Sequence, residues 1–215
     1  NLHRMIDMSP DWKPEASEVN NLMGKLGTPD ILCLQEAGNI SAYQDDIPYS
    51  HIVKFGQNQT ALLSNYPVVN SGQIDMSPEQ SLSGWTDLDI NGTIIRVYSL
   101  YLASNRITVE SERLFEEGTF QSKENIKDAF SVLRRYISRA RIRAQQVEAV
   151  KTSMAESPYP VIVCGDFNDV PLSYSTSQLT KGLRDSFVER GFGIGATYAG
   201  KLPALRIDYV LADDN

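Results

Sequence analysis

The sequence contains few of the residues that bind metals through sulfur or imidazole. Only two cysteines and two histidines occur among its 215 residues. Cys33 and Cys164 each lie inside a short apolar run, and neither has a Cys or His neighbour at the spacing of a zinc site. We therefore expect two separate buried thiols. A disulfide would require the fold to place them side by side, which the sequence leaves open.

Basic residues are scarce relative to acidic ones. The chain has 20 Lys and Arg against 27 Asp and Glu, a net charge of −7 and a pI of about 4.9. A protein that grips long nucleic acids non-specifically usually presents a basic face. This balance argues against a nuclease that tracks along DNA, but it does not exclude one, because a local basic patch is sufficient.

Long apolar runs are absent as well. No segment approaches the roughly 20 apolar residues that span a bilayer, and no signal peptide is visible. The first residue is Asn1 rather than methionine, so we expect the chain to begin inside a longer or trimmed gene product. Its cellular location stays open for that reason. With no internal repeat, linker or low-complexity tract, residues 1–215 are expected to form a single domain.

Apolar periodicity predicts helices and strands in alternating groups. Helical spacing occurs at residues 15–26 and again from about residue 124, where an apolar stripe runs along the second helix. That stripe contains Phe130, Leu133, Ile137, Ala140, Ala144 and Val147. Strand patterns occur at residues 30–35, 60–64, 85–90, 93–102, 161–164 and 206–211. Asn91-Gly92 between two of them is a strong hairpin signal. The order fits an α/β sandwich of two mixed sheets with outer helices.

Acidic residues follow two of the apolar strands. Glu36 comes directly after the strand at residues 30–35, and Asp166 follows the strand at residues 161–164 through Gly165. A carboxylate at the end of a buried strand is held rigidly, where a metal or polar substrate can reach it. Gly165 would allow a substrate or a neighbouring strand to approach closely. Each motif alone has a plainer interpretation, as a solvated strand end or a turn rich in Gly, Asn and Asp.

A third signal is Asp208, which interrupts the apolar strand at residues 206–211. A buried carboxylate needs a donor partner, and a neighbouring Arg would also satisfy it. Oxygen ligands without a Cys/His cluster favour Mg²⁺ over zinc, and Mg²⁺ usually takes one or two protein carboxylates plus phosphate oxygens.

In combination and in this order, these motifs resemble the endonuclease/exonuclease/phosphatase superfamily, and bacterial members most closely. The segments that carry the resemblance are residues 29–36, 64–69, 96–102, 159–169 and 205–210. The resemblance implies a DNase-like, four-layer α/β sandwich, with two mainly antiparallel sheets packed face to face and helices outside. It also implies hydrolysis of phosphate esters, phosphodiesters first, by in-line attack of water with Mg²⁺ or Mn²⁺ as cofactor.

The resemblance assigns roles to individual residues. Glu36 matches the family's metal-binding glutamate, and Asn1 falls where an asparagine near the metal is expected. Asp166 matches the aspartate that orients or deprotonates the attacking water. Asn168 matches the asparagine that hydrogen-bonds the scissile phosphate, and Asp208 matches the aspartate that orients a catalytic histidine.

Three positions depart from the family pattern. The Ser-Asp-His motif that follows the strand of Asp208 is absent, and neither His3 nor His51 takes its place in sequence order. We expect the domain to continue past Asn215 with its last strand. Tyr101 replaces a histidine found in many relatives, and either donates to a phosphate oxygen or is a core tyrosine. His3 is either a substrate contact or a surface residue, and Asn105 is a further predicted substrate contact.

Five arginines cluster on the second helix, at positions 134, 135, 139, 141 and 143. They form either an anion-binding patch or a solvated helix face paired with acids such as Glu148. The expected substrates are nucleic acids, phospholipid head groups or small phosphodiesters, for a monomer without an obligate protein partner. The rival hypothesis is a binding module that has kept the fold and lost its chemistry.

Overall fold

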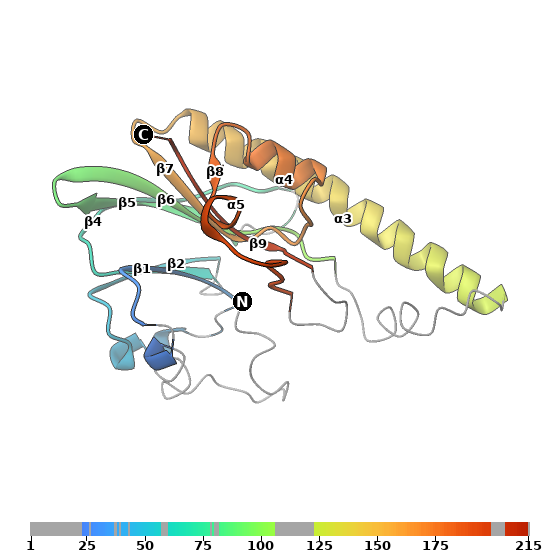
Figure 1. Ribbon diagram of the computed structural model, residues 1–215, viewed down its shortest axis with the longest axis horizontal. Helices are drawn as coiled ribbons and strands as arrows, with labels where there is room; N and C mark the ends of the chain where they lie inside the picture. Colours follow the sequence, from blue (N-terminus) through green and yellow to red (C-terminus); the bar gives the residue numbers. More distant parts are fainter. Residues whose placement is uncertain are drawn as a thin grey trace.

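The computed structural model of the chain describes residues 23–25, 27–36, 38, 40–42, 44–56, 60–77, 79, 82–105, 123–198 and 205–214. Two β-sheets stand one above the other, with a long helix across the outer face of the larger sheet (Figure 1). The predicted helix at residues 15–26 falls mostly outside the described residues. Within it, the structure describes residues 23–25, which are helical.

The small sheet has three antiparallel strands in the order β1-β3-β2. These are β1 (Ile31–Gln35), β3 (Thr60–Ser64) and β2 (His51–Phe55). Two short 3-10 helices, η1 (Ile40–Ala42) and η2 (Gln44–Asp46), lie between β1 and β2 in the chain. β1 and β3 confirm the predictions at residues 30–35 and 60–64.

The large sheet has six strands in the order β4-β5-β6-β7-β9-β8. Their bounds are β4 (Val68–Gln73), β5 (Gly84–Ile90), β6 (Thr93–Tyr101), β7 (Val161–Asp166), β8 (Arg184–Asp185) and β9 (Asp208–Ala212). The β5–β6 hairpin turns at Asn91-Gly92 as predicted. Among the described strands, β6 and β7 are the only parallel pair, so the sheet is mixed and mainly antiparallel.

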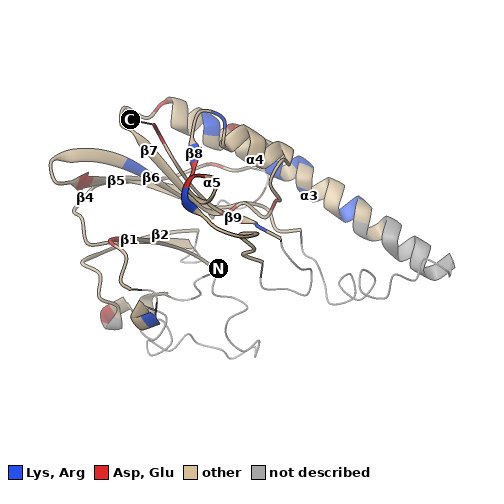
Figure 2. Ribbon diagram, in the orientation of Figure 1, with Lys and Arg blue, Asp and Glu red and all other residues tan. Residues whose placement is uncertain are grey.

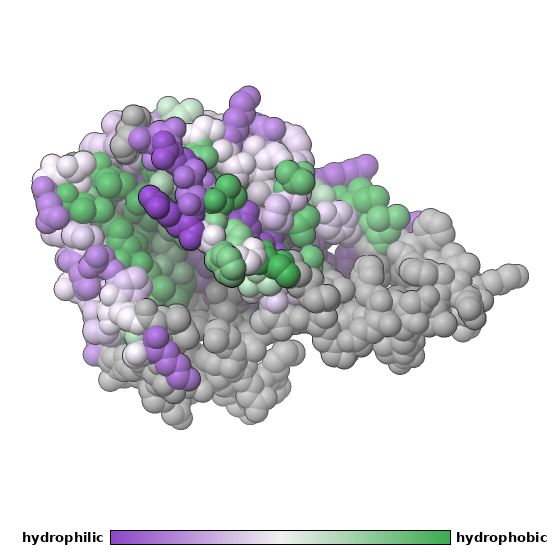
Figure 3. Space-filling view, in the orientation of Figure 1, coloured by the Kyte–Doolittle hydropathy of each residue, from purple (hydrophilic) through white to green (hydrophobic). Residues whose placement is uncertain are grey.

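Alternating side chains sort the strands into layers. In β7, Val161 and Val163 face a core that includes Val147 of the long helix, whereas Ile162 and Cys164 face the small sheet. This period of two is the expected geometry of a strand buried on both faces. Leu62 of β3 reaches the same inter-sheet core from the other side. Figure 3 shows hydrophobic residues in the recess between the two sheets. The layers confirm the predicted DNase-like sandwich.

The long helix α3 (Lys123–Ala155) confirms the helix predicted from about residue 124. Its second half packs on the large sheet through Val147 and Val150. Its first half extends past the edge of the sheets (Figure 1), so Leu133 and Ile137 are about half exposed, at 50% and 43%. The predicted apolar stripe is therefore buried only towards the C-terminal end of the helix. Two short helices, α4 (Tyr174–Leu179) and α5 (Ser186–Arg190), follow β7.

The expectation of two separate thiols is wrong. Cys33 of β1 and Cys164 of β7 are both free, and they lie in the same core between the sheets. The Cys33 thiol beside it and burial together raise the pKa of Cys164 well above its usual value. Because the thiolate is the reactive form, this pair is a packing feature with little nucleophilic character at Cys164. Among the described residues, none of the helices has the length and apolarity to cross a membrane.

Candidate active site

Three strands of the large sheet place polar side chains at one end. The register pairs Tyr101, the last residue of β6, with Asp166, the last residue of β7. It also pairs Asp166 with Asp208, the first residue of β9. The backbone of the sheet therefore fixes these three predicted site residues side by side, although they come from distant parts of the sequence.

Gly165 makes this close alignment possible. Its φ is +147°, and a Cβ at this position would overlap the backbone carbonyl oxygen of Leu100 on β6. The predicted close approach of a neighbouring strand is confirmed. Any larger residue would push β6 away from β7 immediately before the two chemically important positions.

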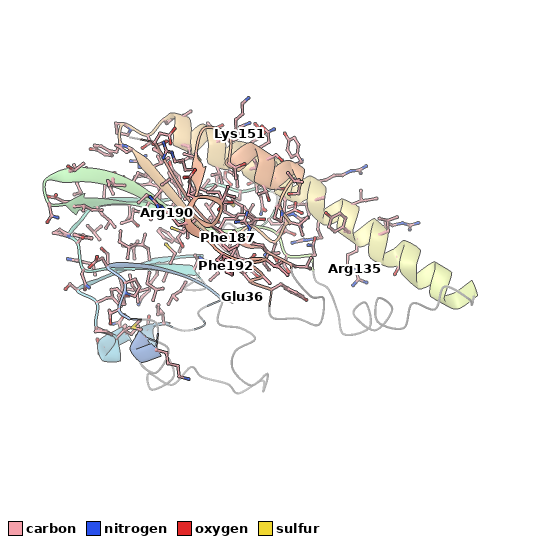
Figure 4. All side chains as sticks on the ribbon, viewed as in Figure 1. Glu36, Arg135, Lys151, Phe187, Arg190 and Phe192 are labelled. Carbon is pink, nitrogen blue, oxygen red and sulfur yellow. The ribbon has the colours of Figure 1, made fainter. Side chains whose placement is uncertain are left out.

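Glu36 joins the site from the small sheet. It follows β1 with a left-handed φ of +54°, and its Oε1 accepts a hydrogen bond of 2.6 Å from the Tyr101 hydroxyl. The preceding residue, Gln35, is buried and donates from Nε2 to Ser99 Oγ of β6 over 3.5 Å. Figure 4 shows Glu36 at the end of β1. The two sheets thus meet through polar contacts at the end of β6, and the site lies across that junction.

The turn after β7 is held by local hydrogen bonds. Asn168 has a left-handed φ of +51°, and its backbone N–H donates to Asp166 Oδ1 over 2.7 Å. Its side-chain Nδ2 donates to the Leu102 carbonyl over 3.0 Å. Both residues are buried, with Asp166 1% and Asn168 8% exposed. Few water contacts remain to compete for these two side chains, so their orientation is set by the protein.

Burial changes the acidity of two neighbouring groups. Burial, the Glu36 carboxylate and Asp166 raise the pKa of Tyr101 far above its usual range. The phenol therefore stays protonated and remains a hydrogen-bond donor. Burial also raises the pKa of Asp208, an effect that a hydrogen bond with Thr197 opposes and the Glu36 carboxylate reinforces.

Asn105 uses both polar atoms of its side chain inside the protein. Its Nδ2 donates to the Asn168 carbonyl over 2.9 Å, and its Oδ1 accepts from Arg143 Nη1 over 2.6 Å. The structure thus places Asn105 beside the predicted site residues, in contact with the backbone of Asn168. Asn1 and His3, predicted as metal and substrate contacts, lie outside the described residues.

The donors gathered here are oxygen atoms, from the carboxylates of Glu36, Asp166 and Asp208. This chemistry suits a hard ion such as Mg²⁺, which keeps several water or phosphate ligands and needs only one or two carboxylates. In the part of the chain that the structure describes, there is no group of three His, Cys, Asp or Glu residues close enough to cage a metal. Glu36, Asp166 and Asp208 are therefore candidate oxygen ligands and do not form a metal cage on their own.

Two arginines of the cluster on α3 lie next to the candidate site. Arg139 and Arg143 turn inward from α3: Arg139 Nε donates to the Ser104 carbonyl over 2.7 Å, and the Arg143 side chain is fully buried. The interpretation of this cluster as a solvated helix face is wrong for these two. Arg134, Arg135 and Arg141 are exposed (Figures 2 and 4). The sequence signal that could have indicated the burial of Arg143 was its helical spacing, because it lies between Ala140 and Val147 on the packed face.

Comparison with known proteins gives one family. A sequence model of the endonuclease/exonuclease/phosphatase family matches residues 8–215. No curated protein matches the chain in a direct search. The matched range includes Glu36, Tyr101, Asp166, Asn168 and Asp208.

Solved structures share the fold at low sequence identity. Humanized D. rerio TDP2 aligns with a TM-score of 0.65 at 17% identity, covering 92% of this chain and 75% of that one. An endonuclease/exonuclease/phosphatase from Bacteroides vulgatus aligns with a TM-score of 0.64 at 13% identity, covering 93% of this chain and 78% of that one. A mannosyl-6-phosphatase from Bacteroides thetaiotaomicron aligns with a TM-score of 0.58 at 14% identity, covering 93% of this chain and 76% of that one. These likenesses show the fold.

Proposed function

Because the chain belongs to the endonuclease/exonuclease/phosphatase family, whose members are typically metal-dependent phosphoesterases, we propose that it hydrolyses phosphate esters by in-line attack of water. The observation that carries the proposal is the alignment of Tyr101, Asp166 and Asp208 across three strands, with Glu36 hydrogen-bonded to Tyr101 from the other sheet. A phosphoester hydrolase needs such an arrangement: positioned donors and carboxylates around one reacting group.

Asp166 orients the attacking water and takes its proton. Its Oδ1 accepts the Asn168 N–H over 2.7 Å, which fixes the orientation of the carboxylate. Asn168 binds an oxygen of the scissile phosphate with its side-chain amide. One hydrogen of that amide is held by the Leu102 carbonyl, and the second is available, since a primary amide has two.

Glu36 is the residue that would hold Mg²⁺ or Mn²⁺, with Asn1 as a second candidate. A bound divalent ion supplies positive charge that stabilises the phosphate oxygens as negative charge develops on them. The Tyr101 hydroxyl fixes one oxygen of Glu36 and thereby limits how the carboxylate rotates. Because Tyr101 stays protonated and its one hydroxyl proton is donated to Glu36, it would donate to a phosphate oxygen only after releasing that bond. Asp208 matches the aspartate that orients a catalytic histidine in the family.

Small or lipid-linked phosphodiesters are the favoured substrates. The net charge of −7 has the same sign as a nucleic-acid backbone, so long-range attraction would not help the protein find DNA or RNA. The solved relatives include a protein named for phosphatase activity on a mannosyl-6-phosphate, and monoesters therefore belong among the substrates tested.

The test is hydrolysis of a substrate panel with and without Mg²⁺. The panel holds an aryl phosphodiester, an aryl phosphomonoester, a phospholipid, RNA, and single- and double-stranded DNA. Asp166→Asn is expected to lower turnover by orders of magnitude with little change in unfolding temperature, because Asn cannot accept the proton from water. The matched control is Asp213→Asn, which alters an aspartate that bonds the other end of β7, at Val161 N.

Metal-dependent turnover that survives in Asp213→Asn and disappears in Asp166→Asn supports the proposal, and the best substrate identifies the branch of the family. Wild-type turnover in Asp166→Asn would contradict the assigned mechanism. Binding of a panel member without any hydrolysis would instead favour a fold that has lost its chemistry.

A further inference from the structure

Arg143 is a fully buried cation that no role in the proposed reaction explains. It lies on α3, and its exposed fraction is 0%. Burying a guanidinium costs several kcal/mol unless the charge is paired and its donors are bonded. Arg143 Nη2 nonetheless has no hydrogen-bond partner among the described residues. A side chain selected for stability alone would not leave a buried donor unused.

The bonds that Arg143 does make bring two segments of the site together. Its Nε donates to Asp169 Oδ2 over 3.1 Å, in the turn that follows β7. Its Nη1 donates to the Ala103 carbonyl over 3.0 Å and to Asn105 Oδ1 over 2.6 Å, in the segment that follows β6. One guanidinium therefore clamps the two stretches of chain that leave the adjacent strand ends Tyr101 and Asp166.

From Asn105 the contacts continue to the proposed reacting groups. Asn105 Nδ2 donates to the backbone carbonyl of Asn168 over 2.9 Å. Asn168 N in turn donates to Asp166 Oδ1 over 2.7 Å. Asn168 is left-handed, with φ at +51°, a conformation that asparagine adopts more readily than most residues and that the surrounding hydrogen bonds hold in place here. The Arg143–Asn105 pair holds the carbonyl of Asn168, and the Arg143–Asp169 pair holds the residue that follows Asn168.

We propose that Arg143 is a positioning residue of the active site, which acts through Asn105 and Asp169 to hold Asn168 in its left-handed conformation and so to aim Asp166. The catalytic consequence of this inference rests on the proposed function, and its structural consequence rests on the hydrogen-bond network. It assigns to Asn105 a supporting role behind Asn168, in place of direct substrate contact.

A matched control exists in the same sheet. Arg96 is also a buried arginine, 8% exposed, and makes a bidentate pair with Asp87 through Nε and Nη2 over 2.7 and 2.9 Å. It lies near the start of β6, five residues before Tyr101 in the same strand, which is roughly 16 Å away at 3.3 Å per residue. Arg96→Lys therefore removes a comparable ion-pair geometry far from the site.

The first readout is independent of activity. Hydrogen exchange of the Asn168 backbone N–H reports whether its bond to Asp166 persists. Arg143→Lys keeps the charge and loses the fork that bonds three acceptors. We expect Asn168 N–H to exchange at least about tenfold faster in Arg143→Lys and in Asn105→Ala, and at the wild-type rate in Arg96→Lys. Unchanged protection of Asn168 in both site variants would overturn the inference.

The second readout is kinetic, on the best substrate of the panel. Arg143→Lys and Asn105→Ala should each lower kcat by about 10- to 100-fold with KM within about twofold, because small displacements of reacting groups affect the transition state most. In the double variant the losses should not multiply, because both residues act along one path. Losses that multiply, or a loss in Arg96→Lys equal to that in Arg143→Lys, would contradict a positioning role.

The two proposals fail separately. Absence of turnover in the wild-type protein would count against the proposed function, while the exchange of Asn168 would still decide whether Arg143 holds the turn. Asn105→Ala serves as the second variant if Arg143→Lys does not fold.

Discussion

Two residues of the candidate site, Glu36 and Asn168, have left-handed backbones with φ of +54° and +51°. Such conformations are uncommon outside glycine and cluster at functional sites, where surrounding contacts impose them. Here Tyr101 holds the Glu36 side chain, and hydrogen bonds hold Asn168 on three sides. In both cases the left-handed residue lies within two residues of the end of a strand, and its side chain lies near the junction of the two sheets.

Asp208 provides a prediction about pH. Burial raises its folded-state pKa above the ordinary value of 3.8, so the folded protein holds this proton more tightly than the unfolded chain does. The resulting stabilisation is complete below pH about 4 and is lost as pH rises through the folded pKa. Asp208→Asn cannot ionise. It should raise the unfolding temperature at neutral pH, and the gain should vanish at pH about 3.

Thermal unfolding of wild-type and Asp208→Asn proteins between pH 3 and pH 8 tests this expectation. An equal difference at every pH would mean that ionisation of Asp208 is not its source. The variant is also expected to lose turnover, since Asp208 is part of the proposed site, and the two measurements together separate stability from chemistry.

At the scale of single residues, the sequence predicted which residues belong to the candidate site better than it predicted their conformation. The sequence predicted Glu36 and Asp166 at strand ends, because apolar runs precede them. It predicted Asp208 inside the strand at residues 206–211, whereas the structure makes Asp208 the first residue of β9. It did not reveal the buried role of Arg143, since a charged residue in a helix with several exposed arginines has no local feature that shows its direction. Only its position between Ala140 and Val147, on the packed face, carried that information.

At the scale of secondary-structure elements, the second half of α3 forms a polar backing for the site. Gln146 is 3% exposed, and its Oε1 accepts the backbone N–H of Ala103 over 2.8 Å. Arg143 binds the carbonyl of the same residue, and Arg139 binds the carbonyl of Ser104. The segment after β6 makes its backbone hydrogen bonds to helix side chains, as a buried loop must if it has no strand partner.

Gln146→Ala should therefore destabilise the protein by about 1–3 kcal/mol, because it leaves the buried N–H of Ala103 without an acceptor. Gln145→Ala is the matched control. It changes the same residue type one position earlier, on the exposed side of α3, and should stay within about 0.5 kcal/mol of wild type. Urea unfolding measures both, and equal effects would show that the Gln146–Ala103 bond contributes nothing specific.

Strands with strong apolar patterns were predicted well, and weakly patterned ones were missed. β1, β3, β5, β6 and β7 each carry long apolar runs or a hairpin signal, and their bounds agree with prediction within a few residues. β4 is mostly exposed and reads Val-Val-Asn-Ser-Gly-Gln, so neither face has an apolar alternation to detect. β8 has two residues, too few for any periodicity.

At the scale of the whole molecule, charge restricts the substrates. The chain carries a net charge of −7, and two of the arginines of α3, Arg139 and Arg143, are paired with Glu79 and Asp169. We expect weak binding to double-stranded DNA, with Kd no tighter than about 10⁻⁵ M at physiological salt. Fluorescence anisotropy with a labelled duplex, over a series of salt concentrations, measures this. Tight binding with a steep salt slope would move the substrate assignment to nucleic acid.

The two-sheet architecture followed from sequence because hydrophobic faces on both sides of a strand require a layer on each side. The position of the site at the junction of the sheets did not follow, since it depends on contacts such as Gln35 to Ser99 that no local pattern encodes. Long-range pairing also placed the two cysteines together.

The order of strands has a consequence for synthesis on the ribosome. β9 lies between β7 and β8 although it is made after both. Until it arrives, β7 presents an open edge of unpaired backbone groups, the kind of surface that attracts other chains. The same insertion brings Asp208 beside Asp166. A nascent chain therefore closes the open edge of β7 and completes its row of acidic residues in a single late event, and a stalled or shortened chain would have both an exposed strand edge and an incomplete site.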